Sequence, residues 1–253
     1  MTQKIADIEY VLFDMDGLMI DSESMYTYVT TTDRILGRYG KEMTWDIKAG
    51  CMGKPERVAA AYLLSHFPDI DLDIETYLEE RNRLQDEMWP TVKLLPGVKK
   101  LVQHLKKHNI PIAIATGSRR SKYILKTSHH PDVFDCFEGK VVCSDDKEYV
   151  SRGKPHPDIF LAAARELLKR DVGVPDAEPT EAHALERSRG LVIEDALTGM
   201  QAGKRAGMKV LWVPDANLLN VAYEGAEVAD KTIKTLDEFV PEEWGLPPYD
   251  LEA

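Results

Sequence analysis

The sequence predicts an α/β protein, with a Rossmann-like parallel-sheet core and a small all-helical domain inserted after the first strand. Short apolar runs alternate with amphipathic segments of helical length through most of the chain, a pattern typical of parallel sheets with helical crossovers. Residues 21–92 interrupt this alternation, because they show helical periodicity without a strand signal. We therefore expect a core domain of residues 1–20 and 93–253 and a helical domain of residues 21–92.

The first strand is predicted over Tyr10–Phe13, an apolar run that ends at Asp14-Met15-Asp16-Gly17. In the insertion, apolar residues at helical spacing predict three helices: Glu23–Tyr39, Pro55–Phe67 and Ile74–Met88. Pro55 suits the first turn of its helix, where a missing N–H costs nothing.

After Leu95-Pro96-Gly97 the alternation of strand and helix resumes. The expected strands are Ile110–Ala115, Val141–Cys143, Leu191–Ile193 and Lys209–Val213. The expected helices are Val98–His108, Arg119–Ser128, Asp158–Lys169 and Ala196–Ala206. Between the last two helices, the acidic segment Asp171–Arg189 shows no periodicity, so we expect an exposed loop there.

The overall charge and the cysteine pattern bound the class of protein. A formal net charge of −11 argues against a nucleic-acid or membrane-surface binder, which needs a basic face. Three cysteines without a CxxC pair indicate a reducing compartment. The chain shows neither a secretory signal nor an apolar stretch of membrane-spanning length. We expect a cytoplasmic monomer that acts on a small molecule.

Polar side chains gather where the predicted strands end. Because the carboxyl ends of parallel strands share one edge of the sheet, these residues should lie close together. They are Asp14, Asp16, Thr116, Glu194 and Asp195, with Lys154 at the start of a neighbouring helix. Each has a bland interpretation of its own, such as a surface lysine or a helix cap, but their joint occurrence at one sheet edge predicts an active site.

This set of residues suits the transfer of a phosphoryl group. Asp14 can attack phosphorus to give an aspartyl-phosphate, and Asp16 can act as general acid and base. Thr116 can hydrogen-bond phosphoryl oxygens together with backbone N–H groups of Gly117 and Ser118, while Lys154 supplies positive charge. Mg²⁺ prefers oxygen ligands, so we expect a Mg²⁺ site made of Asp14, the Asp16 backbone carbonyl and Asp195, helped by Glu194.

Four stretches of the chain resemble the motifs of the haloacid-dehalogenase-like (HAD) phosphatase superfamily. They are Phe13–Gly17, Ala115–Ser118, Gly153–Pro155 and Ile193–Ala196. The resemblance runs through nearly the whole chain and implies a Mg²⁺-dependent phosphohydrolase with the residue roles given above. The helical insertion resembles the alpha-helical cap domain of that superfamily.

Further stretches, including Lys126-Thr127-Ser128 and Gly245-Leu246-Pro247, are similar to those of the pseudouridine-5′-phosphatase group. This resemblance implies pseudouridine 5′-phosphate or a related small ester as the substrate. Discrimination between phosphate esters should come from the insertion, where Glu23, Tyr26 and Lys54 are the candidate substrate-binding residues.

Other functions remain open at this point. The nearest alternatives are phosphatases for glycerol 3-phosphate, sugar phosphates or pentitol phosphates. A phosphoglucomutase-like isomerase is a second class, but Tyr26 stands where we would look for its histidine. A non-enzymatic phospho-accepting receiver would be about half this length and would lack the insertion, and an inactive scaffold would have no need of a full set of residues.

Overall fold

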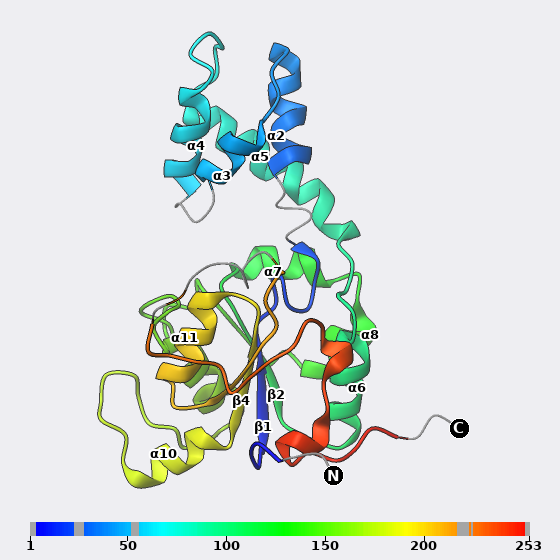
Figure 1. Cartoon of the computed structure of the whole chain (residues 1–253), viewed down its shortest axis with the longest axis vertical. Coiled ribbons are helices and arrows are strands. Elements are labelled where there is room, and N and C mark those ends of the chain that lie inside the picture. Colours follow the sequence, from blue (N-terminus) through cyan, green and yellow to red (C-terminus); the bar gives the residue numbers. More distant parts are fainter. Residues whose placement is uncertain (1–3, 23–27, 52–55, 217–222, 224, 251–253) are drawn as a thin grey trace. The chain divides into compact units, whose positions relative to one another are not determined.

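The computed structural model describes residues 4–22, 28–51, 56–216, 223 and 225–250. It divides into two compact units, one made of Met1–Asp21 with Lys93–Ala253 and the other of Ser22–Val92 (Figure 1). The larger unit contains the sheet and the smaller unit is helical in its described part.

The larger unit is built on one six-stranded sheet in the order β3-β2-β1-β4-β5-β6, and every strand pair is parallel. Its strands are β1 Tyr10–Phe13, β2 Ile112–Thr116, β3 Val141–Cys143, β4 Gly190–Glu194, β5 Lys209–Trp212 and β6 Lys231–Thr232. This order is that of a Rossmann-like sheet, so the predicted fold class is confirmed. The short strand β6 was not predicted.

Strand β1 is fully buried and lies between β2 and β4. Phe13, its last residue, is level with Ile114 of β2 and with Ile193 of β4. The residues that follow Phe13 therefore leave the sheet beside the ends of both neighbouring strands, which is what gathers the polar residues at one edge.

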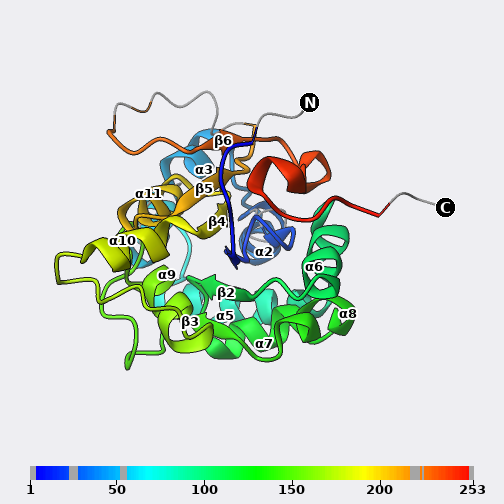
Figure 2. The ribbon, with the colours of Figure 1, turned by 90° about the horizontal axis from the view of Figure 1, so that it is seen from below.

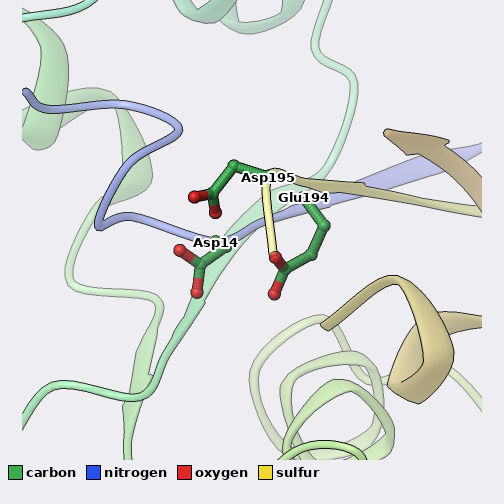
Figure 3. Close-up of side chains that lie close together, drawn as sticks. All are labelled: Asp14, Glu194 and Asp195. Atoms are coloured by element: carbon green, nitrogen blue, oxygen red, sulfur yellow. The ribbon is translucent and has the colours of Figure 1, made fainter. Parts of the chain in front are cut away.

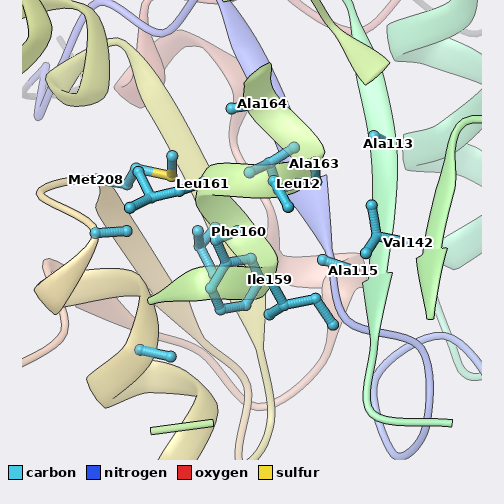
Figure 4. Close-up of a cluster of buried hydrophobic side chains, with 14 of the residues drawn as sticks. Leu12, Ala113, Ala115, Val142, Ile159, Phe160, Leu161, Ala163, Ala164 and Met208 are labelled. Carbon is cyan, nitrogen blue, oxygen red and sulfur yellow. The ribbon is translucent and has the colours of Figure 1, made fainter. Parts of the chain in front are cut away.

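Helices cover both faces of the sheet (Figures 1 and 2). They are α6 Val98–Lys107, α7 Arg120–Thr127, α8 Pro131–Phe134, α9 Asp158–Ala162, α10 Glu181–Ser188 and α11 Leu197–Arg205. Leu12 of β1 packs with Phe160 of α9 in one buried cluster (Figure 4). The next residue, Phe13, makes an edge-on ring contact with Phe137, 5.7 Å between centroids. Successive side chains of β1 thus lie on opposite faces of the sheet.

The expected loop over Asp171–Arg189 is wrong in its second half, because Glu181–Ser188 form helix α10. The Thr180 hydroxyl accepts a hydrogen bond from the His183 backbone N–H and caps this helix. Buried Arg187 donates to the Val172 carbonyl at 2.7 Å and holds the helix on the core. The sequence has weak apolar periodicity here because a polar residue provides the anchor. In addition, α9 continues as a π-helical turn over Ala163–Leu167.

The smaller unit contains α2 Tyr28–Leu36, α3 Trp45–Cys51, α4 Glu56–Ser65 and α5 Ile74–Met88, with single 3₁₀ turns at Gly37–Tyr39 and Trp89–Thr91. Ile35, Ala59, Leu63 and Tyr77 belong to its buried core. Helix α3 was not predicted. Glu23, Tyr26 and Lys54 lie outside the described residues. Among the helices described, none is both long and apolar enough to cross a membrane.

Candidate active site

The site begins where β1 ends, at Asp14. Its backbone N–H donates to the Ile193 carbonyl at 3.0 Å, which continues the pairing of β1 with β4 by one residue. The chain then turns sharply: the Met19 N–H donates to the Met15 carbonyl at 2.9 Å, and the Gly17 N–H donates to the Ile20 carbonyl at 3.1 Å. Gly17 has a φ of 79°, a conformation that favours glycine.

Three carboxylates meet at this sheet edge (Figure 3). Asp14, Glu194 and Asp195 each place one oxygen so that all three lie within 4.8 Å of one another. Glu194 is the last residue of β4, and one of its oxygens accepts the Ala196 N–H at 3.0 Å. Helix α11 approaches closely, since a Cβ on Gly199 would lie 1.7 Å from Glu194 Oε1. The neighbouring elements thus fix where the carboxylates lie.

Lys154 supplies the positive charge of this cluster. It lies on the loop before α9, and its ammonium donates to Asp14 Oδ1 and to Glu194 Oε1. Burial opposes the charged form, but the two carboxylates outweigh it and hold the pKa of Lys154 above its ordinary value. One ammonium therefore faces a cluster of three carboxyl groups, of which Asp14 and Glu194 are buried and Asp195 is half-buried.

Burial, together with the neighbouring negative charges, raises the pKa values of Asp14 and Asp195. Burial raises the pKa of Asp14 to about 7, although Lys154 acts against it. Burial, followed by the charges of Asp14 and Glu194, raises the pKa of Asp195 to about 9. Asp195 Oδ1 is also buried with no hydrogen-bond partner among the described residues. A hard divalent cation fits this donor set. It would supply positive charge to the three carboxylates and coordinate the Asp195 oxygen that has no hydrogen-bond partner in the described part of the chain.

Asp16 belongs to a second set of contacts. One oxygen of its carboxylate accepts from the Ser118 hydroxyl at 2.6 Å and the other accepts from the Lys126 ammonium at 2.6 Å. Lys126 also donates to Ser118 Oγ at 3.1 Å. The Asp16 side chain thus contacts the turn after β2 and helix α7.

Thr116 is the last residue of β2 and is fully buried. Its hydroxyl accepts the backbone N–H of Ser118 at 3.0 Å, which shapes the turn that follows the strand. Gly117, between them, is exposed and has no atom within 4 Å of where a Cβ would stand. The exposed backbone of Gly117 therefore lies at the same edge of the sheet as the carboxylates.

The structure therefore brings most of the expected residues to one edge of the sheet. Asp14, Glu194, Asp195 and Lys154 form one contact group, and Asp16 with Ser118 forms another, next to Thr116 and Gly117. Lys126, which the structure places on Asp16, is not among the site residues predicted from the sequence. A lysine on a short amphipathic helix is typical of a solvent-facing position, so no local signal identified it.

A carboxylate cluster with one lysine, at the carboxyl end of a Rossmann-like sheet, is typical of an enzyme active site. The model of the haloacid dehalogenase-like hydrolase family matches residues 8–207. The chain belongs to this family, which confirms the family resemblance and the expectation of an enzyme.

Several proteins are similar to this chain over most of its length. An Arabidopsis thaliana protein named (DL)-glycerol-3-phosphatase 2 is 41% identical over 244 residues, covering 96% of this chain and 93% of that protein. A Drosophila melanogaster protein named "Probable pseudouridine-5′-phosphatase" is 35% identical over 242 residues, covering 96% of each chain. The crystal structure of an Entamoeba histolytica HAD hydrolase, family IA, variant 3, superposes with a TM-score of 0.68 at 26% identity, covering 94% of this chain and 98% of that one.

Proposed function

We propose that this protein is a Mg²⁺-dependent phosphomonoester hydrolase that acts through an aspartyl-phosphate on Asp14. The observation that carries the proposal is the position of the Asp14 carboxylate. It is buried at the end of β1, contacts the Lys154 ammonium, and lies within 4.8 Å of two further carboxylate oxygens. Phosphatase names among relatives that cover nearly the whole chain support the same reaction.

In this mechanism, an Asp14 oxygen forms a bond to phosphorus while the bond from phosphorus to the ester oxygen breaks. Asp16 gives its proton to the departing oxygen, and later takes a proton from the water that attacks the phospho-enzyme. The Thr116 hydroxyl and the backbone N–H of Gly117 bind phosphoryl oxygens. The Ser118 N–H is already donated to the Thr116 hydroxyl oxygen, so the expected contribution of Ser118 is to shape this turn. Lys154 offsets the negative charge of Asp14 and of the phosphoryl group.

Asp14 and Asp195 are the residues that would hold the cation, together with the backbone carbonyl of Asp16. Glu194 contributes mainly charge, since its two oxygens already accept from Lys154 and from the Ala196 N–H. When bound, Mg²⁺ would neutralise phosphoryl oxygens and orient the phosphate for in-line attack.

We further propose that residues 21–92 act as the cap domain that selects the substrate, and that Glu23, Tyr26 and Lys54 are its substrate-binding residues. Pseudouridine 5′-phosphate is the candidate substrate from the sequence resemblance and from the Drosophila relative. Glycerol 3-phosphate is a second candidate, and the higher identity of the Arabidopsis relative favours it, at 41% against 35%. Cys51, Cys136 and Cys143 form no disulfide bond in the described part of the chain, which supports a cytoplasmic enzyme. We propose that it acts as a monomer.

A phosphate-release screen of the purified protein tests this function. The panel contains pseudouridine 5′-phosphate, glycerol 3-phosphate, sugar phosphates and pentitol phosphates, each with and without Mg²⁺. We expect Mg²⁺-dependent release from at least one ester. An isomerised sugar phosphate without phosphate release would instead indicate a mutase, and no reaction with any ester would reject the proposed function.

A further inference from the structure

Lys126 is an unusual residue for its position. Its side chain has a relative exposure of 0%, although it lies on α7, a helix whose other positions include exposed Ile124. Lysine is rarely buried unless it is paired, because removal of the ammonium from water is costly. A contact with another group must therefore offset the cost of burying the Lys126 ammonium.

One such contact is with the Asp16 carboxylate. The Lys126 ammonium lies 2.6 Å from Asp16 Oδ1, while the Ser118 hydroxyl lies 2.6 Å from Asp16 Oδ2. The ammonium and the hydroxyl also contact each other at 3.1 Å, which closes a triangle of three side chains. Asp16 retains 21% exposure, so the triangle faces the site on the Asp16 side and the protein interior on the Lys126 side.

We propose that Lys126 is a positioning residue for the proton transfer of this enzyme, an inference that rests on the proposed phosphatase function. Lys126 is too buried to contact a substrate, so it acts through Asp16. By holding Oδ1 it fixes the direction in which Oδ2 points. Asp16 Oδ2 accepts from the Ser118 hydroxyl, which can rotate away. Oδ2 is therefore the oxygen that gives its proton to the ester oxygen and then takes a proton from water. Because the leaving oxygen must lie within hydrogen-bond reach of the acid, loss of this orientation slows departure of the leaving group.

A positioning role affects kcat/KM differently for different leaving groups, whereas a purely structural role does not. An alkyl leaving group needs a proton as it departs, whereas dinitrophenolate is a stable anion and needs none. The value of kcat/KM covers the steps up to the first irreversible one, which is departure of the leaving group. Lys126→Met should therefore lower kcat/KM for an alkyl phosphate by about 100-fold, the loss typical of a misplaced group. It should leave kcat/KM for dinitrophenyl phosphate within about threefold of wild type, since only protonation depends on Asp16.

The experiment measures kcat/KM for both esters in wild type, Lys126→Met, Ser118→Ala and Thr127→Val. Thr127 is a matched control, because it is a buried polar residue of α7 whose hydroxyl donates only to the Tyr123 carbonyl among the hydrogen bonds described. Thr127→Val should lower the two values equally or not at all. Ser118→Ala should give the same direction of selectivity as Lys126→Met with a smaller loss, and it replaces Lys126→Met as the test if that variant does not fold.

A double variant completes the test. If Lys126 acts through Asp16, adding Lys126→Met to Asp16→Asn should cause no further loss with the alkyl ester. Equal losses for both esters in Lys126→Met, or an additive loss in the double variant, would overturn the positioning role and leave the phosphatase function standing. A wild-type protein that hydrolyses neither ester would overturn both.

Discussion

Gly17 and Asp195 approach each other so closely that any side chain at position 17 would displace the Asp195 carboxylate. A Cβ on Gly17 would lie 2.2 Å from Asp195 Oδ2. The turn after β1 and the end of β4 therefore set each other's position, and the Asp195 carboxylate keeps its place in the cluster only while residue 17 has no side chain. Gly17 is thus required for its size as well as for its φ of 79°.

Gly17→Ala should raise the Mg²⁺ concentration needed for half-maximal activity by about 10- to 100-fold, the range typical when a supporting contact of a metal ligand is lost. The strain of alanine at positive φ should also lower stability by about 1 kcal/mol. Gly139→Ala is the matched control, because Gly139 has a φ of 74° and nothing within 4 Å of its Cβ position. It should show the stability loss alone, measured by thermal unfolding, with unchanged Mg²⁺ dependence. A Gly17→Ala variant with the Mg²⁺ dependence of wild type would refute this coupling.

Metal removal tests the carboxylate cluster itself. Excess EDTA should stop turnover, added Mg²⁺ should restore it, and Ca²⁺ should inhibit because it accepts a larger and less regular coordination shell. Asp195→Ala should weaken Mg²⁺ binding by at least about 10-fold, measured by titrating activity with Mg²⁺. Undiminished turnover after complete chelation would exclude the metal site.

Asp230 offers a test of the core that is independent of the site. It accepts from Lys204 of α11 at 2.8 Å, from the Val210 N–H of β5 at 2.9 Å and from Lys209 at 3.1 Å. Asp230→Asn should lower the free energy of unfolding at pH 7 by about 1 to 3 kcal/mol, because these donors lose their charged partner. Asp69→Asn is the control, since Asp69 makes an exposed ion pair with Lys41, and it should leave stability unchanged within error.

The same residue predicts a pH dependence. Burial would raise the pKa of Asp230, but Lys204, the Val210 N–H and Lys209 together lower it below its usual value. Its stabilising effect is therefore complete above the unfolded-state pKa of about 3.9 and is lost as the pH falls through the lower folded-state value. The difference in unfolding free energy between wild type and Asp230→Asn should be constant from pH 7 to about pH 5 and shrink below about pH 4. A difference that grows toward acid pH would show that the sign is wrong.

The identity of the substrate is the most specific part of the proposed function. The phosphate-binding groups are common to all monoesters, so discrimination must come from contacts with the leaving portion. Pseudouridine 5′-phosphate should exceed glycerol 3-phosphate in kcat/KM by roughly 10-fold, because one unmet buried hydrogen bond costs about 1 to 3 kcal/mol. Glu23→Ala or Lys54→Ala should reduce that ratio while hydrolysis of an aryl phosphate stays nearly intact. The reverse order of the two substrates would favour the glycerol 3-phosphate alternative and leave the phosphatase function in place.

The sequence predicted the strands and their polar ends because both signals are local. Tyr10–Phe13 is apolar and Asp14 follows it directly, and parallel pairing then determines which strand ends meet. Lys126 could not be found in this way, since its burial depends on a tertiary contact with Asp16, 110 residues away. Helix α10 was missed for a similar reason, because Arg187 reaches the Val172 carbonyl and replaces an apolar stripe as its anchor. Strand β6 has only two residues, too few to show a periodicity.

The covalent intermediate can be sought directly. Asp16→Asn retains the nucleophile but lacks the general acid and base, so it should accumulate the phospho-enzyme when mixed with dinitrophenyl phosphate, whose leaving group needs no proton, and quenched with acid. Mass spectrometry should then find one phosphoryl group on the peptide that contains Asp14. A phosphoryl group on a different peptide would move the nucleophile to another residue.

The turnover of Asp14→Asn, with the best substrate from the phosphate-release screen, tests the covalent mechanism most directly. An amide at this position cannot form the aspartyl-phosphate, so kcat should fall on the order of 10⁶-fold, as for the loss of a catalytic nucleophile elsewhere. Thermal unfolding should show that the variant is still folded. A folded Asp14→Asn variant that releases phosphate at the wild-type rate would exclude Asp14 as the nucleophile.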